Sequence, residues 1–116
     1  MFDSNKRVKG RYSSRYSYYS ITICCEQRAP IFTNFEIACV VSQQIYQFSE
    51  SKRASTICFS LMPDHLHWLF QLQDEAMSLS NLIGQFKSIS TLKVNRERGV
   101  SGRVWQANFY DHKIRA

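Results

Sequence analysis

Apolar residues crowd into three stretches that lack helical spacing and predict strands, at residues 16–25, 54–62 and 65–72. All three are rich in β-branched, aromatic and other apolar side chains, which favour an extended backbone. Only Pro63 and Asp64 separate the second stretch from the third. This pair predicts a tight turn, because proline pre-sets φ and aspartate bonds back to the backbone. Residues 103–115 predict a last strand or a hairpin.

Two other stretches place apolar side chains three and four positions apart and predict helices, over about residues 34–48 and 78–98. Thr33 and Glu36 have the spacing of a capping box at the start of the first helix. The apolar stripe of the first helix comprises Ala38, Val41, Ile45 and Phe48. The second helix has a longer apolar stripe and a basic flank, which suits a helix that packs on one side and meets solvent on the other.

These stretches follow one another in the order β-α-β-β-α-β, which predicts an α+β, ferredoxin-like split βαβ fold. In this fold an antiparallel four-stranded sheet carries both helices on one face, and the first and third strands are central. The pattern predicts one domain over residues 16–116. A basic arm over residues 1–15 precedes it, and such polar terminal segments are often mobile.

The charge of the chain points to a polyanionic partner. Lys and Arg number 15 against 9 Asp and Glu, which gives a net charge of +6 and an isoelectric point near 9.4. Nucleic acid is the commonest partner for such a surface, and a basic surface that only confers solubility is the alternative. The four cysteines contain no C-x-x-C pair, which excludes a zinc ribbon and a thioredoxin-type redox site. Buried reduced thiols and the lack of a signal-like or membrane-spanning segment predict a cytoplasmic protein.

The motif His65-Leu66-His67 carries the most chemical information in the chain. In a strand, side chains at positions i and i+2 project from the same face, so both imidazoles can reach one metal ion. Apolar neighbours such as Trp68 predict a stiff strand beneath such a site. Histidines in apolar strands are more often satisfied core or rim residues, and this alternative stands beside the metal interpretation. His112 is a weak third ligand, because its charged neighbours suit phosphate or solvent better.

Several motifs, taken in order, resemble one family of proteins. They are Met62-Pro63-Asp64-His65-Leu66-His67, Lys87 within a predicted helix, Gly102-Arg103-Val104-Trp105-Gln106, and Phe109-Tyr110-Asp111-His112-Lys113-Ile114-Arg115. From about Tyr16 to its end, the chain resembles the HUH single-tyrosine transposases. Within that family it is most similar to the REP-associated tyrosine transposases and their insertion-sequence relatives.

The resemblance implies the chemistry of DNA transposition. Members of the family bind hairpin or single-stranded ends of mobile or repetitive DNA, cut one strand through a 5′-phosphotyrosine link and later rejoin it. The resemblance assigns His65 and His67 to a divalent metal, Mg²⁺ or Mn²⁺, of which manganese suits imidazole better. Cations hold a DNA backbone and aromatic rings stack on its bases. Basic and aromatic residues therefore predict DNA contacts by Lys87, Arg103, Trp105, His112, Lys113 and Arg115. For Trp105, packing in the core is the alternative to a DNA contact.

The chain departs from the family after Ile114-Arg115, where relatives continue into a helix that carries the nucleophilic tyrosine and, four residues on, an amide metal ligand. Neither residue is assigned here, so we expect impaired strand cleavage and leave open whether the chain is an enzyme. Tyr110 matches an aromatic position, for which packing or stacking is expected. A non-catalytic DNA-binding module kept for regulation and a small metal-dependent hydrolase of free nucleotides are the alternatives. A homodimer is compatible with an uncovered face or edge of the sheet.

Overall fold

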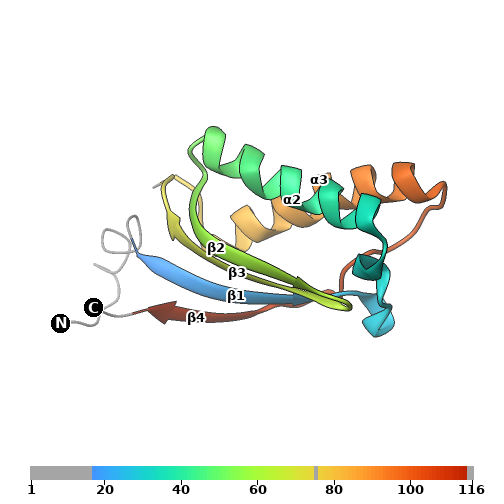
Figure 1. The fold of residues 1–116 in the computed structure, drawn as a ribbon. Helices are drawn as coiled ribbons and strands as arrows, with labels where there is room; N and C mark the ends of the chain where they lie inside the picture. The colour runs from blue at the N-terminus through green and yellow to red at the C-terminus, as the bar shows by residue number, and fades with distance from the viewer. Residues whose placement is uncertain (1–16, 75, 115–116) are drawn as a thin grey trace.

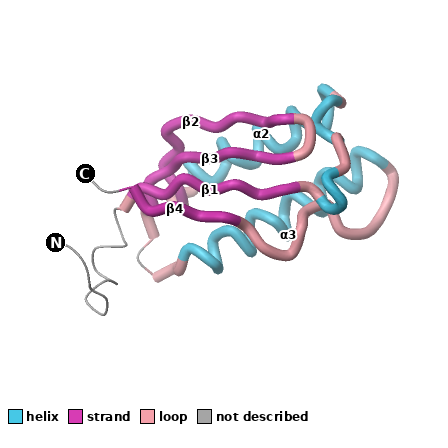
Figure 2. The backbone as a smooth tube through the Cα atoms, turned by 90° about the horizontal axis from the view of Figure 1, so that it is seen from below, coloured by secondary structure: helices cyan, strands magenta, loops and turns pink. Residues whose placement is uncertain are grey.

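Four antiparallel strands form one sheet in the order β2-β3-β1-β4 in the computed structural model, which describes residues 17–74 and 76–114. The strands are β1 (Tyr18–Cys24), β2 (Ala54–Met62), β3 (His65–Leu72) and β4 (Tyr110–Ile114). The long helices α2 (Phe35–Glu50) and α3 (Leu79–Arg98) both lie on one face of the sheet (Figure 1, Figure 2). Two short 3₁₀ helices, η1 (Glu26–Arg28) and η2 (Ile31–Thr33), connect β1 to α2. The predicted α+β split βαβ fold, with its first and third strands at the centre, is therefore confirmed, while the predicted arm over residues 1–15 lies outside the described residues.

The core fills the space between the sheet and the helices. Every second residue of β3, beginning with Leu66, is buried. Trp68 packs against Phe48 of α2 and Phe86 of α3, with ring centroids 6.2 and 4.9 Å away. Burying a side chain of this kind stabilises a fold by about 1.5–3 kcal/mol. This cluster therefore fixes which face of β3 turns inward, and the alternate residues of β3 face away from the helices.

Polar side chains cap the starts of both helices. Asn34 accepts a hydrogen bond from the backbone N–H of Ile37 over 3.2 Å, and Ser78 caps α3 in the same way. The predicted capping box is therefore wrong: Asn34 caps α2, because the hydroxyl of Thr33 donates instead to the carbonyl of Pro30. Within residues 17–74 and 76–114, no helix is long and apolar enough to cross a membrane.

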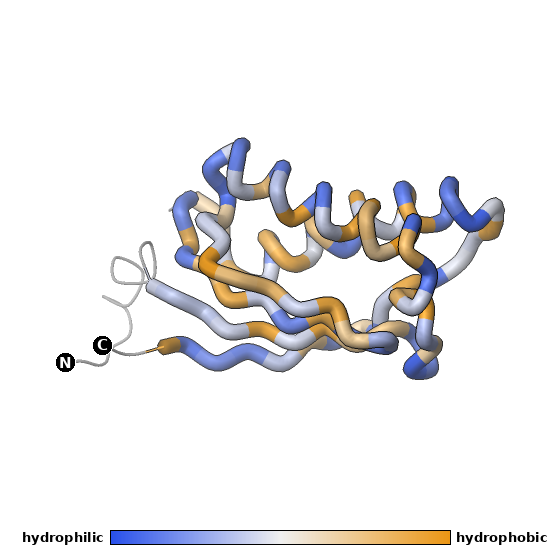
Figure 3. The backbone as a smooth tube through the Cα atoms, in the orientation of Figure 1, coloured by the Kyte–Doolittle hydropathy of each residue, from blue (hydrophilic) through white to orange (hydrophobic). Residues whose placement is uncertain are grey.

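The segment after α3 is a strand only in its last part, so the prediction of a strand or hairpin over residues 103–115 is wrong for its first half. Val104 and Trp105 are buried, and Trp105 forms one isolated bridge with Cys25. The carbonyl groups of residues 106–108 bond to the ammonium of Lys87 instead of to a neighbouring strand. β4 itself lies at the edge of the sheet and is mostly hydrophilic (Figure 3).

The four cysteines are free thiols with different exposures. Cys24 and Cys25 are buried, Cys39 is half-buried and Cys58 is exposed. The prediction of buried thiols is thus wrong for Cys58, because it lies on the edge strand β2 beside an irregularity in the pairing with β3. Burial raises the pKa of the Cys25 thiol to about 12, so this cysteine is protonated and unreactive at neutral pH.

Candidate functional site

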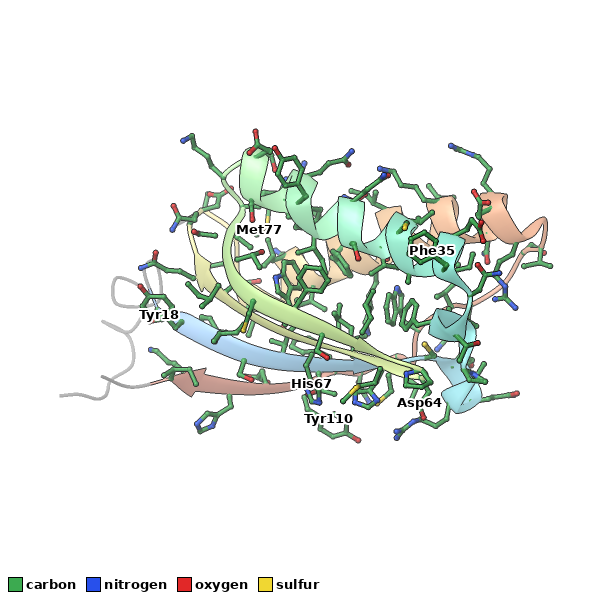
Figure 4. The ribbon with its side chains drawn as sticks, in the orientation of Figure 1. Tyr18, Phe35, Asp64, His67, Met77 and Tyr110 are labelled. Carbon is green, nitrogen blue, oxygen red and sulfur yellow. The ribbon has the colours of Figure 1, made fainter. Side chains whose placement is uncertain are left out.

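His67 lies on the open face of the sheet, which we define as the face turned away from α2 and α3 (Figure 4). His65 lies beside it on the same face, because it is two positions earlier in β3. Leu66, the residue between them, is buried in the core. The two ring centroids are 4.8 Å apart and the ring planes are perpendicular, at 90°. His65 is half-buried and His67 is exposed. The structure thus brings the two predicted ligands together at a place that solvent reaches.

Each of the two imidazoles has a polar partner at Nδ1. Nδ1 of His65 lies 2.8 Å from Oδ1 of Asp64, and Nδ1 of His67 lies 2.8 Å from Oγ1 of Thr22. Thr22 belongs to β1, where the register pairs it with His67. Histidines that bind a metal through one ring nitrogen usually hold the other in such a bond, which orients the ring. These contacts leave Nε2 of both rings for a ligand.

Arg28 completes a chain of polar contacts that ends on His65. Its Nε donates to Oδ2 of Asp64 over 2.9 Å, while the other oxygen of the carboxylate faces His65. The hydrogen bonds from His65 and Arg28 hold the pKa of Asp64 below its ordinary value. Asp64 is therefore an ionised carboxylate at neutral pH, and it places a negative charge beside one histidine of the pair.

Two imidazoles supply only part of a metal's ligand shell. In the described part of the chain, no group of three or more His, Cys, Asp and Glu side chains could hold an ion. Both carboxylate oxygens of Asp64 already face other side chains. The donor set fits a divalent ion that accepts imidazole nitrogen and takes its other ligands from water, phosphate or residues outside the described ranges. Mn²⁺ meets this requirement better than Mg²⁺, which prefers oxygen.

The strand register places Tyr110 in the same row of the sheet as His67. Thr22 pairs with His67 on one side and with Tyr110 on the other. Because directly paired residues share a face, Tyr110 lies on the open face with the histidines (Figure 4). Tyr110 is 69% exposed. We expected either core packing or stacking for Tyr110. Its exposure excludes core packing, so stacking is the remaining role.

The residues predicted to contact DNA are divided between the two faces of the sheet. The pairing of β1 with β4 places His112 on the open face, where it is exposed. Lys113 pairs with the buried Tyr19, so it lies on the face that carries the helices. Arg103 is exposed in the segment before β4, and Arg115 lies outside the described residues. The structure therefore brings His112, but not Lys113, to the same face as the histidine pair.

Lys87 and Trp105 both form hydrogen bonds to other parts of the protein. Nζ of Lys87 donates to the carbonyl oxygens of residues 106, 107 and 108, at 2.8, 3.0 and 3.3 Å. Burial and then the charge of Arg103 lower the pKa of Lys87. Trp105 is 2% exposed, and its Nε1 donates to Oγ of Ser90 over 2.9 Å. Trp105 therefore packs in the core, which was the alternative to a DNA contact. Lys87 holds the segment that leads into β4.

Sequence reasoning missed three side chains that support the histidines: Thr22, Arg28 and Asp64. Asp64 adjoins His65, but its place in a proline-containing turn indicated a bond to the backbone. Arg28 and Asp64 are 36 residues apart, and Thr22 and His67 are 45 residues apart. No local pattern signals contacts at such separations, since they depend on strand register and on the path of the loop after β1.

Comparisons with known proteins place this chain among transposases. A family model described as "Transposase IS200 like" matches residues 13–115. No curated protein matches the sequence significantly. Nine chains of solved structures match. One is a REP-associated tyrosine transposase bound to a REP hairpin, which is 15% identical with a TM-score of 0.66. Another, from Deinococcus radiodurans R1 and described as a candidate transposase, is 13% identical with a TM-score of 0.72.

The two structural matches differ in how much of each relative they cover. The match to the hairpin-bound transposase covers 100% of this chain and 64% of that one. The match to the Deinococcus radiodurans protein covers 99% of this chain and 87% of that one. The chain thus spans less than two thirds of the hairpin-bound relative. At these identities the two structures show a shared fold.

Proposed function

Because the chain belongs to the IS200-like transposase family, we propose that it is a transposase domain that binds hairpin or single-stranded DNA on the open face of its sheet. The observation that carries the proposal is the position of His65 and His67, whose Nδ1 contacts leave both Nε2 atoms for a ligand on that face. The similar REP-associated transposase is bound to a hairpin. The net charge of +6 suits such a partner, because phosphate contacts dominate affinity for nucleic acids.

His65 and His67 would hold a divalent ion, Mn²⁺ or Mg²⁺, together with water and an oxygen of the DNA. When bound, such an ion polarises the scissile phosphate and stabilises charge on its oxygens. Asp64 and Thr22 keep the two rings in place, and β3 gives them rigid support. The proposed reaction is the family's cleavage and rejoining of one strand through a 5′-phosphotyrosine. Its tyrosine nucleophile is assigned to none of the described residues.

Side chains around the open face would contact the DNA directly. We assign base stacking to Tyr110, because its exposed ring lies in the same row as His67. Phosphate contacts are assigned to Arg103, His112, Lys113 and Arg115, of which His112 lies on the open face itself. Lys87 and Trp105 contribute indirectly, by holding the segment that leads into β4.

A DNA-binding module without strand cleavage is the second candidate, because no nucleophile is assigned within residues 17–74 and 76–114. Both candidates bind the same DNA, so only a cleavage assay separates them. Either could act as a homodimer. Residues 57–60 of the edge strand β2 are exposed, and an exposed edge can pair with a second copy. Size-exclusion chromatography with light scattering measures that state.

The test uses labelled hairpin and single-stranded DNA with the 116-residue chain. Mn²⁺ binding by calorimetry should be lost when His65 and His67 are both replaced by alanine and kept in His112→Ala, the matched histidine control. Fluorescence anisotropy should show weaker DNA binding for Arg103→Ala than for Arg96→Ala, a charge control on α3. A covalent protein–DNA adduct on a denaturing gel would establish cleavage. Equal Mn²⁺ binding by the wild type and the double variant would contradict the metal assignment.

A further inference from the structure

Three side chains, Arg28, Asp64 and His65, form a relay that supports the histidine pair from one side. We propose that Arg28, acting through Asp64, fixes the orientation and tautomer of His65 and is a positioning residue for the metal site. This inference rests on the proposed function and deepens it, because it concerns the same site. Arg28 acts through its contact with Asp64, so its effect on an ion is indirect.

The direction of the hydrogen bonds determines the tautomer of His65. Oδ2 of Asp64 accepts from Nε of Arg28 over 2.9 Å, and Oδ1 lies 2.8 Å from Nδ1 of His65. An ionised carboxylate only accepts hydrogen bonds, so Nδ1 of His65 must carry the proton in this contact. Nε2 of the neutral ring is then unprotonated, which is the state that a metal ligand needs.

Thr22, the partner of His67, does not determine which ring nitrogen of His67 carries the proton. The hydroxyl of Thr22, 2.8 Å from Nδ1 of His67, can either donate or accept. His67 is also exposed, whereas His65 is half-buried beside the carboxylate. The two histidines therefore differ in how firmly they are held. Asp64 thus fixes both the orientation and the tautomer of His65. Thr22 orients the ring of His67 and is compatible with either tautomer.

The backbone around Arg28 takes an uncommon conformation that brings the guanidinium to Asp64. Arg28 and the residue before it both have a φ of 55°, in the left-handed region that residues other than glycine rarely adopt. Two hydrogen bonds join this segment to the turn before His65. The backbone N–H of Cys25 donates to the carbonyl of Asp64 over 2.9 Å, and that of Phe32 donates to the carbonyl of Pro63 over 3.1 Å. The loop is thus anchored to the turn on both sides of Arg28.

Stability does not account for this arrangement. The side chains of Arg28 and Asp64 are 56% and 27% exposed, and ion pairs as exposed as this one contribute little to folding. Left-handed backbone at two successive residues destabilises a fold instead of stabilising it. Strain of this kind is typical of segments that hold a side chain at a functional position.

The tautomer can be measured without any metal. Nitrogen-15 NMR of the metal-free chain, at a pH of about 8 where an ordinary imidazole is neutral, reports which ring nitrogen of His65 carries the proton. The wild type is expected to show Nδ1–H. Asp64→Ala should shift His65 toward Nε2–H, the form that free imidazole side chains prefer, and Arg28→Ala should shift it part of the way. Arg28→Lys, which keeps a cation for Asp64, should restore part of the wild-type signal.

Calorimetric titration with Mn²⁺ gives a second measurement. Losing the outer partner of a metal-bound histidine typically weakens binding by about 10- to 100-fold. We expect a loss in this range for Asp64→Ala and a smaller loss in the same direction for Arg28→Ala. Arg96→Ala, which removes an exposed cation from α3, is the matched control and should bind as the wild type does. Thermal unfolding of each variant reports whether the fold is kept.

Two results would overturn the proposal: a wild-type His65 protonated at Nε2, or folded Arg28→Ala and Asp64→Ala variants that keep both the tautomer and the Mn²⁺ affinity of the wild type. Failure of the proposed function looks different. A wild-type chain that binds no Mn²⁺, but whose Nδ1–H tautomer is lost in Asp64→Ala, would contradict the metal site and support the relay.

Discussion

Thr22 and His67 are 45 residues apart in the chain, yet Oγ1 of Thr22 lies 2.8 Å from Nδ1 of His67. On the other histidine, the corresponding nitrogen meets the carboxylate of Asp64 at the same distance of 2.8 Å. Hydrogen bonds to charged groups are stronger than those between neutral groups. The histidine pair is therefore supported unequally, and the two supports can be separated by mutation.

Thr22→Val should weaken Mn²⁺ binding while leaving the fold intact, because valine keeps the shape of threonine and removes the hydroxyl. We expect a loss of about 2- to 10-fold, the range for one neutral hydrogen bond, which is less than the loss expected for Asp64→Ala. Calorimetric titration measures it. Thr22→Ser keeps the hydroxyl and serves as the control. Wild-type affinity in Thr22→Val would show that the hydroxyl does not support His67.

Tyr110 can be tested for stacking on DNA by removing its ring and its hydroxyl separately. Stacking of one base on an aromatic ring contributes about 1–3 kcal/mol, so Tyr110→Ala should weaken single-stranded DNA binding by about 5- to 160-fold. Tyr110→Phe should bind as the wild type does, since its ring remains. Fluorescence anisotropy with a labelled oligonucleotide measures both. A covalent adduct that forms with the wild type and disappears in Tyr110→Phe would instead identify Tyr110 as a nucleophile.

Local sequence chemistry was enough to predict most of the fold. The predicted strands at residues 54–62 and 65–72 coincide with β2 and β3, because the apolar runs and the Pro63-Asp64 turn are both local signals. The structure of residues 103–109 could not be predicted in this way, because its contacts are not local. The backbone of this segment bonds to the ammonium of Lys87 and to the backbone of Cys24 and Glu26, which lie far away in the sequence. Apolar and aromatic residues there fill the core without forming a strand.

The candidate site was predictable only along one strand. A period of two placed His65 and His67 on the same face, and the structure agrees. Which residues of β4 share that face depends on where the strand starts, because a shift by one residue exchanges the faces. The interleaving of basic and aromatic residues groups His112 and Lys113 as DNA contacts, whereas the register places them on opposite faces.

Tryptophan fluorescence can test the core position of Trp105. The chain has two tryptophans, and Trp68 and Trp105 are 1% and 2% exposed. Iodide should therefore quench the folded chain weakly, and saturating hairpin DNA should change the emission little. The chain unfolded in guanidinium, where both indoles meet solvent, is the control for full quenching. Strong quenching on adding DNA would mean that a base reaches an indole and that Trp105 leaves the core.

Lys87→Met should destabilise the segment that leads into β4. Methionine keeps much of the aliphatic length but cannot donate, so three backbone carbonyls lose a charged partner. We expect the free energy of unfolding to fall by about 1–3 kcal/mol and amide exchange to rise over residues 105–114. Lys93→Met is the matched control, because Lys93 donates one exposed hydrogen bond to Gln47. Equal effects of the two substitutions would contradict a special role for Lys87.

Cys25 gives the fold a dependence on alkaline pH. Burial and then the charge of Asp64 raise the pKa of its thiol from 9.0 to about 12. Between these values the unfolded chain loses the proton while the folded chain keeps it, so the unfolded state is favoured and stability falls as pH rises above about 9. Urea unfolding at several pH values from neutral to alkaline should therefore show a steeper decline for the wild type than for Cys25→Ala. Cys58→Ala, which replaces an exposed thiol, should decline as steeply as the wild type. Parallel declines in the wild type and Cys25→Ala would show that the Cys25 thiol is not the group responsible.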